Sequence, residues 1–183
     1  MTQTQLKQHR DYFYTAEATS AGKQGDRWQG ELTIYREGPG GSLSERVEQM
    51  LVPGDFDHMS EAIDAAEAFA PGRIDEIRFA DWVQTHLAPL FPANADFTLL
   101  DDKGVRISWP IPEEGRIHRR SRPIAIHFAT EVATAIRRET ADRRDQIGKK
   151  AAETVERAKA KHDPQGSVAD ADVIELDTEI LDK

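Results

Sequence analysis

Apolar and polar residues alternate along three segments of the first half of the chain, with the period of two that is typical of half-buried β-strands. These segments span residues 12–18, 28–34 and, more weakly, 46–52. Glycine- and proline-rich turns separate them. One helical face then carries Ala62, Ile63, Ala66, Phe69 and Ala70 before the break expected at Pro71-Gly72. The pattern predicts a disordered N-terminus over residues 1–9 and a βββα unit over residues 10–72.

The second half reads as helix, strand, strand, strand, helix. An apolar face over residues 74–87 precedes alternating segments at 97–100, 105–109 and 124–128, and residues 101–104 suit a hairpin turn. The last helix is expected to follow Thr130 and to run to about residue 146. Gly148 then costs about 1 kcal/mol of helix propensity relative to alanine, which favours bending or fraying. The pattern predicts an αβββα unit over residues 73–162 and an α+β fold class.

Charge changes the picture in the last third of the chain. The net charge is −9, and residues 115–162 hold 13 basic against 6 acidic side chains. Residues 163–183 hold 7 acidic side chains and one basic one, with scattered apolar residues, so we expect an acidic disordered tail. The apolar stripe of the last helix is thin and the helix is long, which favours a homodimer through this helix.

The basic block supplies the candidate binding residues. We predict an anion or nucleic-acid site at Arg116, Arg119, Arg120, Arg122, Arg137 and Arg138. Guanidinium groups make paired hydrogen bonds to phosphate or carboxylate, and counterion release favours binding to a nucleic-acid backbone. The alternatives are a solvated helix face and docking of the protein's own acidic tail or acidic first half. Phe13, Trp28 and Tyr35 could stack on bases, but their spacing fits a sheet core.

The sequence contains little that supports a catalytic or metal-binding site. The chain has no cysteine, which excludes disulfides, thiolate zinc sites and iron–sulfur clusters. Its six histidines lack metal-ligand spacing, and neither a nucleophile elbow nor a phosphate loop occurs. We therefore predict no catalytic residue, no metal and no cofactor. The polar start of the chain and the absence of a long apolar run predict a cytoplasmic protein outside the membrane.

Five short segments of the second half share the pattern of a known family. They are Arg73-Ile74-Asp75-Glu76-Ile77, Leu90-Phe91-Pro92, Phe97-Thr98-Leu99, Val105-Arg106-Ile107-Ser108-Trp109 and Arg122-Pro123-Ile124-Ala125-Ile126-His127-Phe128. Over about residues 73–165 the chain resembles a family of small β-proteobacterial proteins classed only as a domain of unknown function, which implies a fold and no activity. The α-β-β-β-α order is also similar to that of the double-stranded-RNA-binding fold, at the level of topology alone.

Together these observations favour a non-enzymatic binding or regulatory protein that acts through contacts with an unidentified protein partner. One alternative is nucleic-acid binding through the basic 116–122 loop and the helix that follows. Another is a small-ligand binder or enzyme with a site between the two halves.

Overall fold

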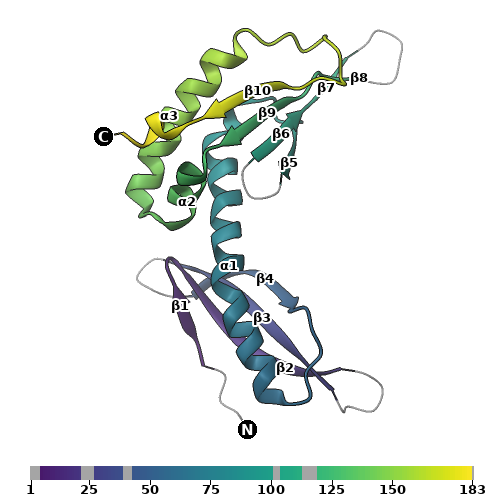
Figure 1. The fold of residues 1–183 in the computed structure, drawn as a ribbon, viewed down its shortest axis with the longest axis vertical. Coiled ribbons are helices and arrows are strands. Elements are labelled where there is room, and N and C mark those ends of the chain that lie inside the picture. Colours follow the sequence, from purple (N-terminus) through teal and green to yellow (C-terminus); the bar gives the residue numbers. More distant parts are fainter. Residues whose placement is uncertain (1–4, 22–26, 39–42, 101–103, 113–118, 183) are drawn as a thin grey trace. The chain divides into compact units, whose positions relative to one another are not determined.

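The computed structural model describes residues 5–21, 27–38, 43–100, 104–112 and 119–182 (Figure 1). The chain divides into two compact units, Met1–Glu76 and Ile77–Lys183. Both contain antiparallel strands and helix, so the predicted α+β class is confirmed. The helix α1 (Met59–His86) contributes residues to each unit.

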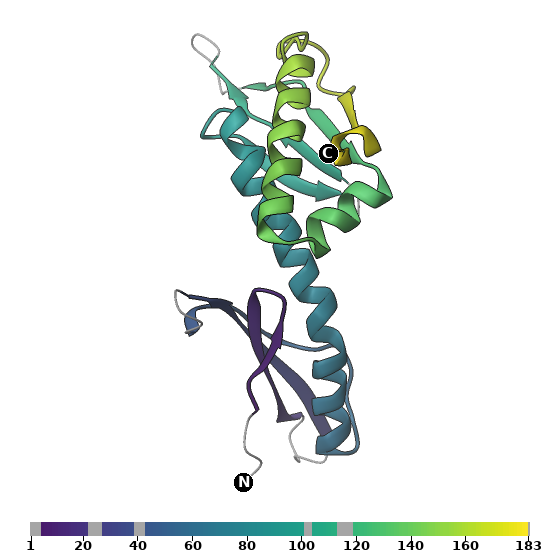
Figure 2. The ribbon, with the colours of Figure 1, turned by 90° about the vertical axis from the view of Figure 1, so that its left-hand side faces the viewer.

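Unit 1 (Met1–Glu76) is a four-stranded antiparallel sheet, here called sheet 1, with the first part of α1 on one face (Figure 2). Its strands, in spatial order, are β1 (Lys7–His9), β2 (Tyr12–Ala21), β3 (Arg27–Glu37) and β4 (Leu43–Leu51). Leu32 and Ile34 alternate onto the covered face and are fully buried there. A Cβ at Gly30 would lie 2.4 Å from the carbonyl oxygen of Ala62, so this glycine lets α1 approach β3 closely.

Two boundaries predicted for this half of the chain are wrong. Lys7–His9 forms the edge strand β1, although the sequence suggested a disordered start. The helix α1 also runs through Pro71, where a break was expected. An interior proline costs about 3 kcal/mol because it removes a hydrogen bond and crowds the preceding turn. Ala70 and Ile74 are fully buried on either side of it, and their burial favours a continuous helix.

Unit 2 (Ile77–Lys183) holds a second sheet, in the order β10-β9-β6-β5, and the helices that cover one of its faces. Its elements are η2 (Ala88–Leu90), β5 (Asp96–Leu100), β6 (Gly104–Ser108), β7 (Pro110–Ile111), β8 (Arg119–Arg120), β9 (Ile124–Phe128), α2 (Thr130–Arg138), α3 (Ala141–Lys159), β10 (Asp172–Leu176) and η3 (Thr178–Leu181). Trp82 of α1, Ile126 of β9, Ile136 of α2 and Ile147 of α3 meet in one apolar core. Of the turn predicted at residues 101–104, residues 101–103 lie outside the described residues and Gly104 begins β6.

The predicted long last helix is two helices, because the chain leaves the helical conformation at Glu139 and Thr140. α3 then continues across Gly148 without interruption. Its apolar stripe, with Ile147, Ala151 and Val155, is fully buried in the core of its own unit. The stripe is therefore not exposed, and it cannot form the homodimer contact that was expected through this helix.

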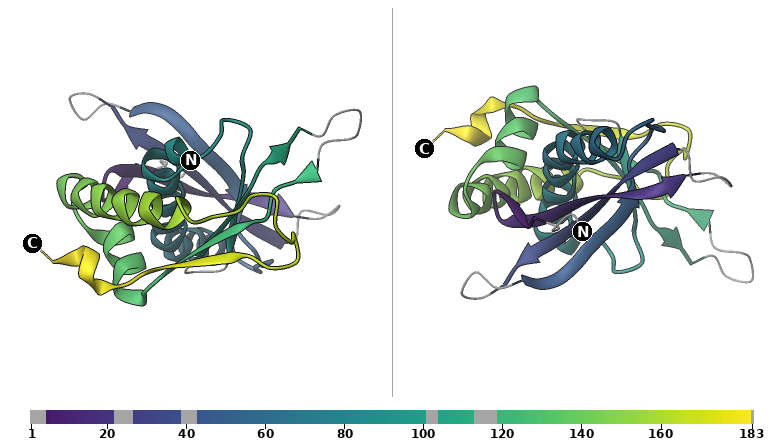
Figure 3. Two further views of the ribbon diagram at one scale, coloured as in Figure 1. Left: turned by 90° about the horizontal axis from the view of Figure 1, so that it is seen from above. Right: turned by 90° about the horizontal axis from the view of Figure 1, so that it is seen from below.

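The acidic tail is also ordered, which contradicts the predicted disorder. β10 pairs in parallel with β9 over five residues, and Figure 3 shows it, in yellow, running beside β9. Ile174, Leu176 and Ile180 are buried in the core. This fourth, parallel strand also departs from the α-β-β-β-α order of the double-stranded-RNA-binding fold. Among the described helices, none is long and apolar enough to cross a bilayer.

Candidate functional site

The structure divides the predicted arginine set into two groups. Arg119, Arg120 and Arg122 lie on β8 and just before β9, whereas Arg137 and Arg138 end α2. Figure 1 shows β8 and α2 at different ends of the second sheet. Arg116 lies outside the described residues. The described members of the set therefore do not form one continuous basic surface.

Arg119 and Arg122, two members of the first arginine group, bind the protein's own C-terminal segment, whereas Arg120 pairs with Asp96 of β5. Arg119 donates from Nη2 to the carbonyl oxygens of Gln165 at 3.1 Å and Gly166 at 2.8 Å. Arg122 donates from Nε to the carbonyl oxygen of Asp170 at 3.0 Å, and its Nη2 lies 2.7 Å from Oδ1 of Asp172. Of the alternatives left open by the sequence, docking of the tail is the one observed for these residues.

Docking of the tail relies on main-chain carbonyl groups more than on carboxylates. At the far end of the segment, Arg143 donates to the carbonyl oxygen of Leu181 and Lys150 to that of Asp182. The side chains of Asp170, Glu175, Asp177, Glu179 and Asp182 remain exposed. Because carbonyl groups carry no net charge, the docked tail keeps most of its negative charge on the surface.

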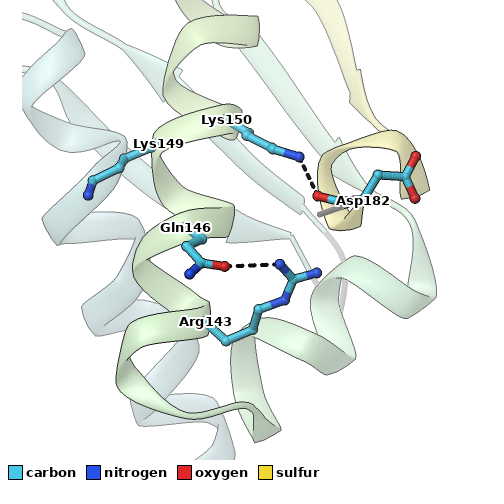
Figure 4. A pocket seen from close by; sticks show the side chains of 5 residues that line it. All are labelled: Arg143, Gln146, Lys149, Lys150 and Asp182. Atoms are coloured by element: carbon cyan, nitrogen blue, oxygen red, sulfur yellow. Dashed lines mark hydrogen bonds between the residues drawn. The ribbon is translucent and has the colours of Figure 1, made fainter.

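A cavity of about 610 Å³ lies between α3 and η3. It is lined by Arg143, Gln146, Lys149, Lys150 and Asp182. Figure 4 shows the side chains of Arg143 and Lys150 directed toward η3, with Lys149 extending to the other side of the helix. The carboxylate of Asp182 points away from α3. We call this cavity the α3–η3 pocket. Sequence reasoning placed its cations in the basic helix, but did not select them as a site.

The spacing of the lining residues in the sequence could have indicated this pocket. Arg143, Gln146 and Lys150 follow one another at intervals of three and four residues, so they share one face of α3. Arg143 also donates from Nη1 to Oε1 of Gln146 at 3.1 Å. The sequence could not show that η3 closes the other side, because the tail was expected to be disordered.

His86, at the end of α1, packs against α3 beside Gly148. Burial is the main cause that lowers its pKa from the ordinary value of 6.5. The charges of Arg144 and Lys149 also lower this pKa, and that of Asp145 opposes the shift. His86 is therefore held in its neutral form near neutral pH. Across the described residues, no three His, Asp or Glu side chains gather as metal ligands.

The face of sheet 1 that points away from α1 carries a further set of residues, here called the outer face. Three pairs lie directly opposite one another on β2 and β3: Phe13 with Tyr35, Thr15 with Thr33, and Glu17 with Glu31. All six side chains are half-buried except that of Glu17, which is exposed. The prediction that Phe13 and Tyr35 belong to a sheet core is therefore wrong. The covered face instead holds Tyr12 and Tyr14, at 3% and 8% exposure.

Electrostatically, the outer face belongs to an acidic unit. Residues 1–76 hold 7 basic and 14 acidic side chains, a net charge of −7. Glu31 accepts a hydrogen bond from Gln49 on β4, which in turn accepts one from Arg46. Arg46 pairs with Tyr35 in the register and places a cation at this edge of the face.

No protein-family model, curated protein or solved structure matches the chain. The resemblance to a β-proteobacterial family therefore stays an expectation.

Proposed function

We propose that the protein is a non-enzymatic binding protein that acts through protein–protein contacts, and that its outer face binds a basic segment of a partner protein. The observation that carries this proposal is that the Phe13–Tyr35 pair and the Glu17–Glu31 pair lie on the same face, opposite α1. The aromatic pair offers contact area, and the carboxylate pair offers charge.

Aromatic side chains are enriched at protein interfaces, and their rings attract Arg and Lys cations. Directly opposed residues on neighbouring strands lie about 5 Å apart, so Phe13 and Tyr35 make a single apolar patch. Glu17 lies four residues farther along β2, which is a distance of about 13 Å on an extended strand. An extended segment with spaced basic side chains can therefore contact the aromatic patch and the carboxylates together.

Charge supports a basic partner. Like charges directly opposed across a strand pair are unfavourable, so the Glu17–Glu31 pair favours a cationic ligand over an anionic one. The net charge of −7 on residues 1–76 would also steer a basic partner toward this unit. The same charge repels nucleic acid from the outer face.

Nucleic-acid binding through the predicted arginines receives less support. Arg119 and Arg122 donate to the tail, and the α2 arginines lie elsewhere in the unit. A ligand or catalytic site between the two halves stays a prediction. The cytoplasmic location expected from the sequence forms part of the present proposal.

The test is a titration of ¹⁵N-labelled protein with a synthetic peptide of alternating Arg and Thr residues, followed by amide chemical shifts. A peptide of alternating Glu and Thr is the control ligand. We expect saturable shifts at amides of β2 and β3 with the basic peptide only. Phe13→Ala combined with Tyr35→Ala should weaken binding by about tenfold or more, because buried aromatic residues dominate interface energetics.

Phe69→Ala is the matched control, since Phe69 is an aromatic residue of the same unit that lies on α1 and is 36% exposed. It should bind the peptide as the wild type does. Equal affinity of the double variant and the wild type, or shifts that follow α1 instead of the strands, would contradict the proposal.

A further inference from the structure

We propose that the α3–η3 pocket is a binding site for the phosphate group of a small phosphorylated molecule. Its volume, about 610 Å³, lies in the range of pockets that hold small ligands. This inference concerns unit 2 and is independent of the outer face of sheet 1.

The donors of the pocket suit a phosphate group. A guanidinium has five N–H donors and an ammonium has three. Arg143 donates one hydrogen bond to Gln146 and one to the carbonyl oxygen of Leu181. Lys150 donates one to the carbonyl oxygen of Asp182. Each cation thus keeps further donors, and the amide nitrogen of Gln146 adds another. Arginine matches phosphate through its planar fork, while lysine acts as a point charge.

The local field also favours an anion. Arg143 lies in the first turn of α3, where the positive end of the helix dipole adds to its charge. The carboxylate of Asp182 points away from the helix, as Figure 4 shows. Lys149 also lines the pocket, and its side chain extends toward the other side of α3, where it lies 3.6 Å from Asp145.

A small molecule fits these observations better than a nucleic acid does. The cations that line the pocket are three residues of a single helix, next to the exposed carboxylates of the tail. A polyphosphate backbone needs an extended basic surface, and the predicted arginines do not provide one. An oligonucleotide is therefore an outcome that the test must distinguish.

The probe is inorganic pyrophosphate, titrated at constant ionic strength into the full-length protein and followed by calorimetry and amide shifts. We expect saturable binding with shifts confined to residues 143–150 and 178–182. Lys150→Gln should weaken binding by about tenfold or more, as loss of a hydrogen bond between charged groups does. Because Lys150 also holds the tail, a second variant is needed.

Gln146→Glu serves this purpose, because the new carboxylate still accepts the Arg143 hydrogen bond but repels phosphate. It should lose binding while keeping the thermal unfolding midpoint of the wild type. Arg157→Gln is the control, because it makes the same change in net charge. Arg157 is exposed on α3 and, among the described residues, donates to Glu153 and Thr154 of the same helix. It should bind as the wild type does.

Three results would overturn the proposal. The first is no saturable binding of pyrophosphate at constant ionic strength. The second is an equal loss of affinity in Gln146→Glu and Arg157→Gln, which would indicate a diffuse charge effect. The third is tighter binding of a single-stranded oligonucleotide that depends on the same residues, which would identify a nucleic-acid site.

Discussion

At the scale of single residues, Gly72 and Gly148 both lie inside helices, but their surroundings differ. A Cβ at Gly72 would meet nothing within 4 Å, whereas one at Gly148 would lie 2.3 Å from Nδ1 and 2.4 Å from Cγ of His86. We expect Gly72→Ala to raise the free energy of unfolding by about 1 kcal/mol through helix propensity. Gly148→Ala should lower it by about 1–3 kcal/mol through overpacking. Urea unfolding measures both, and a gain in both variants would contradict the close approach of His86 to α3.

His86 makes stability depend on pH. Burial lowers its pKa in the folded protein below the unfolded value of about 6.5, so the unfolded state binds the proton more readily. The contribution of this residue is therefore complete above that pH and decreases as the pH falls through it. Titration of the His86 ring by NMR should give a midpoint below 6.5. Replacement by Gln, which is neutral at every pH, should reduce the loss of stability on acidification, and an unchanged pH profile would count against this account.

At the scale of elements, the C-terminal strand depends on Arg122. This side chain contacts the carbonyl of Asp170 and the carboxylate of Asp172, immediately before and at the start of β10. We expect Arg122→Ala to cost about 1–3 kcal/mol and to speed hydrogen exchange at the amides of β10. Arg120 forms an ion pair with Asp96, and both side chains are exposed. Arg120→Ala should therefore change the free energy of unfolding by less than about 1 kcal/mol. Equal exchange rates of β10 amides in the two variants would show that Arg122 does not hold this strand.

The elements also show where sequence reasoning succeeds and where it stops. Period-two alternation located the central strands, because the large buried side chains of each lie on one face. It missed β10, whose buried residues are only Ile174 and Leu176 among acidic neighbours. Proline at position 71 predicted a break, but local propensity yielded to burial in α1.

The candidate sites were harder to predict, because they too depend on how the elements pack and not on local sequence alone. Both faces of β2 carry aromatic side chains, so alternation alone cannot decide whether Tyr12 and Tyr14 or Phe13 face the core. The position of α1 decides which face is buried, because the helix packs on one face of sheet 1 in the folded chain (Figure 2). The sequence shows how many arginines the segment has. Their placement at two ends of unit 2 depends on the tertiary structure.

At the scale of the whole molecule, charge and binding are divided between the units. Residues 1–76 carry a net charge of −7 and an outer face suited to a basic partner, while the cationic pocket of unit 2 suits an anion. The tail docks through carbonyl groups and keeps its carboxylates exposed, so docking does not remove the acidity of the surface. The outer face is proposed to select its partner by charge.

Reversal of charge on the outer face tests this claim most directly. The measurement is the affinity of Glu17→Lys combined with Glu31→Lys for the alternating Arg–Thr and Glu–Thr peptides. Glu61→Lys combined with Asp64→Lys, two exposed positions on α1, makes the same change in net charge away from the face. We predict that the first variant prefers the acidic peptide and that the second keeps the wild-type preference for the basic one. The same preference in both variants would contradict binding at the outer face.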